Sequence, residues 1–343
     1  MHIIDTRYLK RMNDEYIKKE HGYGGQVTRR LIEEIIIPAV NNPAADRMDD
    51  SARVKTAGGD ILFSTDGYVV NPFFFPGGDI GKLAVSGTVN DIIAQGGKAE
   101  YISAGVIIEE GFLIKDFKTI IDFAAAEARQ AGVDIVCGDI KVVEPGAADG
   151  IFITTAGIGN AIEGIFKKEI APGDEIIVTG GVGEHGAAIF QVRNNIVRES
   201  DIIRSDAKAL NKLYPVMEKY FSHIKFMRDP TRGGLAQIAL ELSEREGFSV
   251  ELNEKDIPVK EWVRGLSYIT GIDYLYLACE GRMVIVCEGG KTSEIVENLI
   301  ENGFKDAARI GEINVGRRAA LKTKTGGIRH LTAGEIAQIP RIC

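Results

Sequence analysis

The sequence lacks an excess of basic residues, and this absence argues against several partners. Its 343 residues carry 41 Lys+Arg against 49 Asp+Glu, which gives a net charge of −8. A nucleic-acid-binding protein needs a basic face to neutralise phosphates, so we expect no nucleic-acid partner. Long apolar runs are missing as well, because no stretch approaches the roughly 18–20 residues that cross a membrane. We therefore expect no membrane association.

Cysteine is scarce, with four residues at positions 137, 279, 287 and 343. Their spacing fits neither a zinc site nor a disulfide framework. This favours a reducing compartment, and we expect a cytoplasmic protein. Glycine is abundant instead, at 40 of 343 residues, or about 12%, where about 7% is average. The glycines cluster, which indicates a backbone that closely approaches a ligand.

The remaining composition is that of an ordinary globular protein. Hydrophobic residues make up 45% and charged residues 26%, and a chain of this length usually forms two domains. Strand and helix patterns alternate in each half, which predicts an α+β fold. We expect strands at 61–70, 101–108, 135–136, 151–155, 176–179 and 283–286, and helices at 31–36 (ending at Pro38), 80–93, 116–128 and 293–300.

These patterns divide the chain into four parts. Residues 1–41 are predicted to form a polar extension, a glycine turn and a lead-in helix, and residues 42–160 an N-terminal domain. Residues 161–330 are predicted to form a C-terminal α+β domain. The remaining residues, 331–343, have little to pack, and we expect them to form a flexible tail that carries the final cysteine.

A glycine-rich turn before the helix at 80–93 is the most specific local motif. It reads Pro76-Gly77-Gly78-Asp79-Ile80-Gly81-Lys82. Glycines before a helix start leave backbone N–H groups open to an anion, and the helix dipole adds to the attraction. The spacing is not that of a Walker A loop. A phosphate site and a plain turn capped by Asp79 explain the motif equally well.

Five aspartates stand in or beside apolar elements. They are Asp49 and Asp50 before the first strand, Asp66 within that strand, Asp91 in the helix at 80–93, and Asp139 after a later strand. Carboxylates in apolar elements are costly unless they are paired or bound to a cation. Beside a glycine-rich turn they indicate Mg²⁺ and the phosphates of a nucleotide. The alternative is that some of them are caps, turns or buried Asp–Lys pairs.

Three other motifs have two interpretations each. His21 lies in a glycine turn with Gly24 and Gly25, where it could cover phosphates or face solvent. Arg232, in Thr231-Arg232-Gly233-Gly234, precedes a helix whose N–H groups could face an anion or form a simple capping turn. Glu280, before an apolar strand, is either a base or a surface acid, and the sequence alone favours the surface acid.

The terminal residue, Cys343, is a candidate carrier of a chemical group. Pro340 and Arg341 make the end stiff and cationic, which suits an acidic, nucleotide-containing site. The 13 residues from Leu331 reach up to about 43 Å at ~3.3 Å per residue. That distance could bring the thiol into such a site or out to a partner. The alternative is an inert, frayed end.

Together these motifs resemble the HypE family, the carbamoyl dehydratases of [NiFe]-hydrogenase maturation. The similarity extends from His21 to Cys343, nearly the whole chain. The matching motifs are Thr65-Asp66, Phe74 to Ala84, Asn90-Asp91, Glu109-Glu110-Gly111, Gly138-Asp139 with Lys141-Val142-Val143, Asp229 with Thr231 to Gly234, Glu280-Gly281 and the closing Pro-Arg-Ile-Cys.

The resemblance implies an aminoimidazole-ribonucleotide-synthetase-like fold of two α+β domains. In a homodimer, the N-terminal domains would pair into a barrel. It implies an enzyme that uses ATP to dehydrate a carbamoyl group on Cys343 to a thiocyanate, the source of cyanide for the hydrogenase iron centre. The implied cofactors are ATP, bound by residues 42–160, and Mg²⁺. The implied partners are the carbamoyltransferase HypF and the iron-scaffold complex HypC–HypD.

The resemblance also implies roles for single residues. Cys343 would carry the carbamoyl group, while Lys141 and Glu280 would polarise its amide oxygen and take a proton. The implied ATP ligands are His21, Gly24, Gly25, Asp66, Gly77, Gly78, Asp79, Lys82, Asn90, Asp91, Asp139 and Arg232. The implied metal ligands are Asp49 or Asp50, Asp66, Asp91 and Asp139.

Two positions depart from the family pattern. Ile140 stands where the family reads Thr, which removes a hydroxyl contact, and Tyr23 replaces a small residue in the first glycine turn. Two other functions stay open. One is an ATP-dependent kinase or amide-activating synthetase that acts on a free small molecule. The other is a nucleotide-binding scaffold without turnover, against which the retained acids argue.

Overall fold

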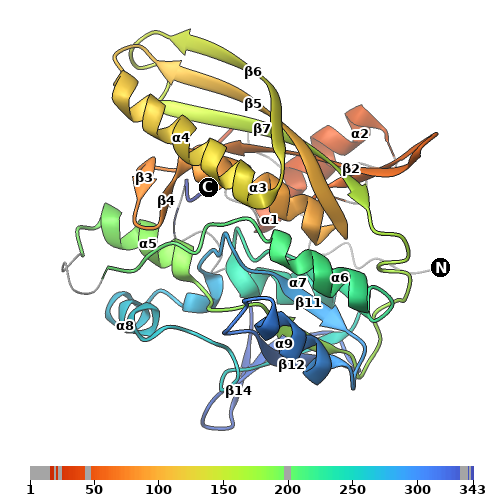
Figure 1. The fold of residues 1–343 in the computed structure, drawn as a ribbon. Helices are drawn as coiled ribbons and strands as arrows, with labels where there is room; N and C mark the ends of the chain where they lie inside the picture. Colours follow the sequence, from red (N-terminus) through yellow and green to blue (C-terminus); the bar gives the residue numbers. More distant parts are fainter. Residues whose placement is uncertain are drawn as a thin grey trace.

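The computed structural model places two layered halves one above the other (Figure 1). It describes residues 16–18, 21, 25–42, 48–196, 202–332, 339 and 341–343. Most of the expected extension, Gly24 and much of the expected tail lie outside the described residues. Each half combines helices with one large sheet, so the expected α+β class is confirmed.

The N-terminal half is built on a five-stranded sheet in the order β1-β2-β7-β5-β6. Its strands are β1 (Ala52–Thr56), β2 (Gly59–Tyr68), β5 (Gly97–Glu109), β6 (Asp134–Val143) and β7 (Ile151–Ala161). Neighbouring strands are antiparallel except β5 and β6, which run parallel. A parallel pair needs a crossover connection, which here is helix α4 (Ile114–Ala131).

Helix α3 (Ile80–Ala94) lies with α4 against one face of this sheet (Figure 1). It begins at Asp79, whose carboxylate accepts a hydrogen bond from the Lys82 backbone N–H at 2.8 Å, as the sequence predicts for a cap. Every residue of α3 is buried except Lys82 and Asp91. A helix buried on nearly all sides lies between two layers, and α3 shares one apolar core with side chains of both halves. Its two partly exposed polar side chains therefore mark where a ligand could approach.

The opposite face of the N-terminal sheet is open within the part of the chain that the structure describes. We call the apolar side chains Val54, Phe63, Tyr101, Ile107 and Ile158 the open face. They are 40–46% exposed, and the strand register places them on the same side of the sheet. Soluble monomers rarely leave a contiguous apolar patch uncovered.

The C-terminal half contains a seven-stranded sheet in the order β14-β13-β10-β12-β8-β11-β9, with five helices around it. The strands are β8 (Glu175–Val178), β9 (Ile224–Arg228), β10 (Ser249–Asn253), β11 (Val284–Cys287), β12 (Ala308–Asn314), β13 (Ala319–Lys322) and β14 (Ile328–His330). The helices are α5 (Glu184–Arg193), α6 (Tyr214–Tyr220), α7 (Gly234–Glu246), α8 (Glu261–Thr270) and α9 (Thr292–Glu301).

Short elements in the described part of the chain include α1 (Gly25–Leu31), a π-helical turn (Ile32–Ile36), α2 (Ile37–Val40), β3 (Phe74–Phe75), β4 (Gly78–Asp79) and the 3₁₀ turns Asn211–Leu213 and Tyr274–Tyr276. The expected helix end at Pro38 is wrong, because helical structure continues to Val40. Pro38 lies in the first turn of α2, where a missing N–H is tolerated.

Candidate functional site

Four aspartates from distant segments meet where the two halves join. Asp66 lies on β2, Asp91 on α3, Asp50 just before β1 and Asp229 just after β9. Burial, followed by the charges of Asp229, Asp50 and Asp66, raises the pKa of Asp91 well above its usual value. We call these four residues the acidic cluster.

The pKa values within the acidic cluster follow from burial and repulsion. Burial first, and then the charge of Asp50, raise the pKa of Asp229 to about 8. Burial also raises the pKa of Asp66, while Arg232 opposes the shift. Carboxylates that disfavour each other's ionisation gain from a cation placed among them. The cluster therefore fits the predicted metal and phosphate chemistry better than the predicted Asp–Lys pairs.

Asp49 and Asp50, the two candidate metal ligands that precede β1, have different surroundings in the structure. Asp50 forms an ion pair with Arg228, at 3.0 Å from Nη2 to Oδ1, and belongs to the acidic cluster. Asp49 instead pairs with Arg245, at 2.9 Å, on the side of α7. Of the two, Asp50 is therefore the metal-ligand candidate that the geometry supports.

Among the described residues, no group of three metal-binding side chains is arranged closely enough to hold an ion by itself. This agrees with the way Mg²⁺ is usually bound, through one or two carboxylates, several waters and substrate phosphates. The buried, mutually repelling oxygens of Asp66 and Asp91 are a donor set that such an ion fits.

Asp139 and Lys141 do not join the acidic cluster within one chain. Asp139 and Thr154 both pair with Gly105, and Thr154 in turn pairs with Gly67, the neighbour of Asp66. Because side chains alternate along strands, Asp139 and Asp66 point to opposite faces of the sheet. The Asp139 carboxylate pairs with the Lys141 ammonium instead, and both side chains are about two-thirds exposed.

The glycine-rich turn is held against the C-terminal half. Gly77 has φ +101°, and a Cβ there would lie 2.6 Å from the Ser205 carbonyl oxygen, so the site requires glycine. The Ser205 N–H donates to the Pro76 carbonyl at 2.7 Å. Lys82 Nζ donates to the Gly77 carbonyl at 3.2 Å, which places its ammonium beside the turn. Burial raises the pKa of the capping carboxylate, Asp79, to about 6.

Three other predicted ATP ligands lie within the described residues. Asn90 is buried, and its amide donates to the carbonyls of Lys208 and Glu280, at 3.1 and 3.2 Å, and accepts from Leu210 N–H at 2.9 Å. It therefore braces α3 against the C-terminal half. His21 is buried, and its Nδ1 accepts from the Lys18 N–H at 2.8 Å. Gly25 begins α1, and Gly24 is outside the described residues.

Glu280 is buried at the junction, which contradicts the surface-turn interpretation. Its Oε1 has no hydrogen-bond partner among the residues that the structure describes. Burial, followed by the charges of Asp229, Asp206 and Asp66, raises its pKa well above the usual range. The Asp206 carboxylate fixes the loop by accepting from the N–H groups of Glu280 and Gly281, at 3.2 and 3.3 Å. A desolvated carboxylate of this kind is a strong base.

Cys343 lies at the same junction. Its Sγ accepts a hydrogen bond from Arg232 Nε at 3.3 Å. The thiol is buried, and burial raises its pKa to about 12, although Arg232 acts in the opposite direction. The charges of Glu280 and Asp66 act on the same thiol, which places the candidate carrier atom, the candidate base and the acidic cluster in one site.

The last residues are packed, contrary to the expectation that they have little to contact. Ile342 and Cys343 are 8% and 7% exposed and join the core around Tyr68 and Ile80. They are held by a set of groups that we call the tail seat. The tail seat consists of the backbone at Val69 and Asn71 and the side chains of Asp149, His185 and Arg193.

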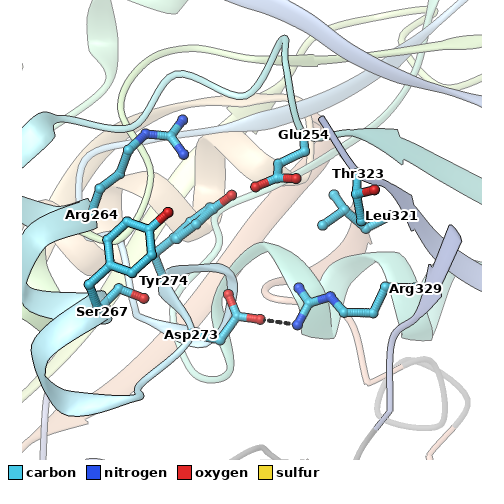
Figure 2. Close-up of a pocket in the computed structure, with 9 residues that line it drawn as sticks. Glu254, Arg264, Ser267, Asp273, Tyr274, Leu321, Thr323 and Arg329 are labelled. Atoms are coloured by element: carbon cyan, nitrogen blue, oxygen red, sulfur yellow. Dashed lines mark hydrogen bonds and ion pairs between the residues drawn. The ribbon is translucent and has the colours of Figure 1, made fainter. Parts of the chain in front are cut away.

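A separate pocket of about 280 Å³ lies in the C-terminal half. Figure 2 shows that charged and aromatic side chains line it, with Asp273 and Arg329 paired across one side. Arg264 lies over the ring of Tyr274 at 5.3 Å. None of the residues that line this pocket was predicted as a site residue, and none belongs to the acidic cluster.

Several functional residues were missed by the sequence interpretation. A capping turn and an anion site explain the motif around Asp229 equally well, and the sequence gives no signal at Asp206, Asp149 or Arg193. The hydrogen bonds of Asp206, Asp149 and Arg193 join residues 74 to 192 positions apart, so no local pattern marks them. The Pro and Gly residues that follow Asp229 were the one available signal.

Two family models match the chain. Residues 48–161 match the N-terminal domain of AIR synthase related proteins, and residues 171–324 match the corresponding C-terminal domain. Within the described residues, no helix is both long and apolar enough to cross a membrane.

Curated and solved relatives cover nearly the whole chain. The carbamoyl dehydratase HypE of Azotobacter vinelandii is 39% identical over 95% of this chain and 97% of its own. A HypE structure solved in a HypE–HypF complex superposes with a TM-score of 0.83 at 41% identity, over 88% of this chain and 99% of its own. A HypE structure in complex with ATP superposes with a TM-score of 0.78 at 36% identity, over 96% of this chain and 100% of its own.

Proposed function

Because the chain belongs to the HypE family of carbamoyl dehydratases, we propose that it converts a carbamoyl group on its own Cys343 into a thiocyanate at the expense of ATP. The observation that carries this proposal is the position of the Cys343 thiol, buried beside Arg232 and within the electrostatic reach of Glu280 and Asp66. A terminal thiol held at an acidic, ATP-compatible site is suited to carry a reacting group rather than to stabilise the fold.

The chemistry requires activation of a poor leaving group. A thiocarbamate, S–C(=O)–NH₂, must lose its oxygen and two N–H protons to become S–C≡N. ATP, a substrate in this reaction, would transfer its terminal phosphoryl group to the amide oxygen, and one N–H proton would leave. Loss of phosphate and the second proton then forms the nitrile. Overall, the thiocarbamate and ATP yield the thiocyanate, ADP and phosphate, so the elements of water lost by the thiocarbamate are taken up in the cleavage of ATP.

Glu280 is the group that we assign to proton removal. Its buried Oε1 makes no hydrogen bond to another described residue, and its pKa is raised, so the ionised form has a strong tendency to take a proton. The Asp206 carboxylate holds the Glu280 backbone in place. Arg232, which donates to the thiol, would orient the sulfur and balance negative charge that develops on the attached group.

ATP would be bound between the glycine-rich turn and the acidic cluster. The turn at Gly77 and Gly78, with the Lys82 ammonium beside it, supplies the groups that suit phosphate oxygens. Asp50, Asp66 and Asp91 would hold Mg²⁺, which neutralises phosphate charge when bound. A solved HypE binds ATP, which supports the same substrate here. His21, Gly24, Gly25, Asn90 and Asp139 remain predicted ligands.

We propose that two copies form a homodimer through the open face of the N-terminal sheet. Its five large side chains, 40–46% exposed, form an apolar surface that a second sheet would cover. Asp139 and Lys141 project from that side. If Lys141 polarises the amide oxygen, it would therefore do so in the site of the second copy and not in the site of its own chain.

The proposed partners follow from the carrier role. A solved HypE forms a complex with HypF, and we propose that HypF loads the carbamoyl group onto Cys343 of this chain. The HypC–HypD complex would then take the cyano group to iron. A carrier thiol has to stay reduced, and all four cysteines are free in the structure, which supports a cytoplasmic location.

The test is intact mass spectrometry of the chain after carbamoylation by HypF and addition of Mg²⁺ and ATP. The carbamoylated wild type should lose the mass of one water, and ATP hydrolysis should depend on the carbamoyl group. Cys343→Ala should show neither effect but still bind ATP, whereas the matched variant Cys137→Ser, at an exposed cysteine, should behave like the wild type. Turnover that ignores carbamoylation would favour the kinase or synthetase alternative, and no turnover would favour the scaffold.

A further inference from the structure

The end of the chain is bound mainly through its backbone. The N–H groups of Val69 and Asn71 donate to the carbonyls of Cys343 and Arg341, at 3.1 and 3.4 Å. Alternate N–H groups that pair with alternate carbonyls are the pattern of an added β-strand. The Arg341 side chain is also held, since it pairs with Asp149 and donates to the Val69 carbonyl at 2.9 Å.

Helix α5 supplies two further contacts to this backbone. His185 Nε2 lies 2.7 Å from the Ile342 carbonyl oxygen, and Arg193 Nη2 donates to the Arg341 carbonyl. One helix thus contacts two successive carbonyls of the terminal peptide. Arg193 also donates to the Asn71 carbonyl, so it bridges the tail and the segment with which the tail pairs.

The His185 ring is fully committed to one arrangement. A carbonyl only accepts hydrogen bonds, so Nε2 carries the proton and Nδ1 accepts from the Ser205 hydroxyl at 2.7 Å. The Ser205 Oγ in turn accepts from the Ala207 N–H at 3.0 Å. The ring is fully buried and stands edge-on to Phe75, with centroids 5.4 Å apart. Burial lowers the His185 pKa, which keeps this neutral tautomer.

We propose that α5 is the element that seats the C-terminal peptide, with His185 and Arg193 as positioning residues that determine where the Cys343 sulfur lies. This inference rests on the proposed function of Cys343 as a carrier, and it names the residues that hold the carrier in place. Neither residue contacts the sulfur itself. They hold the two preceding carbonyls, and because peptide units are rigid, a fixed Ile342 carbonyl restricts the position of the next residue. Ser205 connects this seat to the glycine-rich turn through Pro76.

The experiment measures how often the thiol leaves its seat, and it needs neither ATP nor a carbamoyl donor. Cys137→Ser removes the exposed thiol, so iodoacetamide labels Cys343 only when the tail undocks. The buried Cys279 and Cys287 react only on unfolding. A single added label on the intact mass therefore reports undocking, and three labels report unfolding.

Two substitutions of His185 separate the two ring contacts. The amide of Asn stands near the Nδ1 position and keeps a partner for Ser205, whereas the amide nitrogen of Gln stands near Nε2 and can donate to Ile342. We expect His185→Asn to accelerate Cys343 labelling about fivefold, which corresponds to ~1 kcal/mol, the usual net value of one hydrogen bond. His185→Gln should stay within about twofold of the parent.

Two more variants complete the test. Arg193→Gln, at a partly exposed position, should accelerate single labelling about fivefold. This variant tests the proposal if a His185 variant unfolds. His223→Asn, a histidine paired with Glu288 away from the tail, should leave the labelling rate unchanged. The proposal is overturned if His185→Asn or Arg193→Gln labels at the parent rate while folded, or if His185→Gln labels as fast as His185→Asn. Failure of carbamoyl dehydration would leave this result unaffected.

Discussion

Arg232 donates a hydrogen bond from Nε to the Sγ of Cys343, 111 positions further along the chain, at 3.3 Å. Arg232 lies in the C-terminal half just before α7, and Cys343 is the terminal residue, packed against the end of β2 in the N-terminal half. One hydrogen bond therefore joins the carrier atom to both halves of the molecule. This relationship suggests a second role for Arg232, whose binding of ATP stays a prediction.

The first prediction separates these two roles of Arg232. Arg232→Gln should lower the conversion of carbamoylated Cys343 by at least about tenfold, because the charge-assisted contact to the sulfur is lost. ATP affinity should change less than about threefold, measured by calorimetry on the same variant. Arg129→Gln, at an exposed position on α4, is the matched control. An equal loss of ATP affinity and conversion would restore the ATP-binding role.

The second prediction concerns Glu280 as the base. Glu280→Gln keeps the size and the neutral hydrogen-bonding capacity of the buried side chain but cannot take a proton. It should accept the carbamoyl group normally and convert it at least about 100-fold more slowly. Intact mass, followed over time after ATP addition, measures both steps. Conversion at the wild-type rate would return Glu280 to a structural role.

The third prediction concerns repulsion in the acidic cluster. Asp91→Asn removes one charge from buried, mutually repelling carboxylates, so without a divalent cation the protein should become more stable, with Tm higher by about 2–5 °C. The further rise in Tm that Mg²⁺ and ATP produce in the wild type should shrink in the variant. Asp122→Asn, in an exposed pair with Lys118, should do neither. An unchanged response to Mg²⁺ and ATP would make Asp91 a structural residue.

The fourth prediction concerns pH. The pKa of Asp229 is raised from 3.8 to about 8 in the folded protein. A raised carboxylate pKa contributes stability when the group is protonated, and this contribution decreases as pH rises from about 4 through 8. Without Mg²⁺ and nucleotide, Tm should therefore fall between pH 5 and pH 8.5, and Asp229→Asn should flatten that slope. A wild-type Tm that rises over this range would contradict the raised pKa.

The fifth prediction concerns the open face. Ile158→Lys places a charge in the middle of this apolar surface and should weaken self-association by at least about 100-fold, because an unpaired buried charge is costly. Light scattering after size-exclusion chromatography reports the molar mass. Ile300→Lys, at a similarly exposed isoleucine on α9, should remain dimeric. A wild-type chain that is monomeric would remove the proposal.

Much of the N-terminal half could be predicted from the sequence, because its elements carry strong local patterns. The cap at Asp79, the helix that follows it and the strand that contains Asp66 were all placed within a few residues. The C-terminal sheet was predicted less completely. Its strands β9, β10, β12, β13 and β14 were missed, since strands of three to seven residues have too short a pattern to stand out from neighbouring loops.

The site divides in the same way. The sequence could nominate Asp66, Asp91 and Cys343 because acids in apolar elements and a cysteine at the chain end are local anomalies. It could not place Asp139 on the opposite face from Asp66, since strand order and register determine which face a side chain joins. Nor could it separate Asp50 from Asp49, two neighbours whose partners, Arg228 and Arg245, lie far along the chain.

The sequence by itself determined the family and the two-domain α+β architecture and nominated Cys343 as the carrier thiol, because each depends on residue type, order and local periodicity. The tertiary structure alone decided which acids share an electrostatic site, that Glu280 is buried and that the terminal peptide docks against α5 and the segment that follows β2. These properties depend on desolvation and on contacts between separate elements, and they exist only once the two halves have packed together.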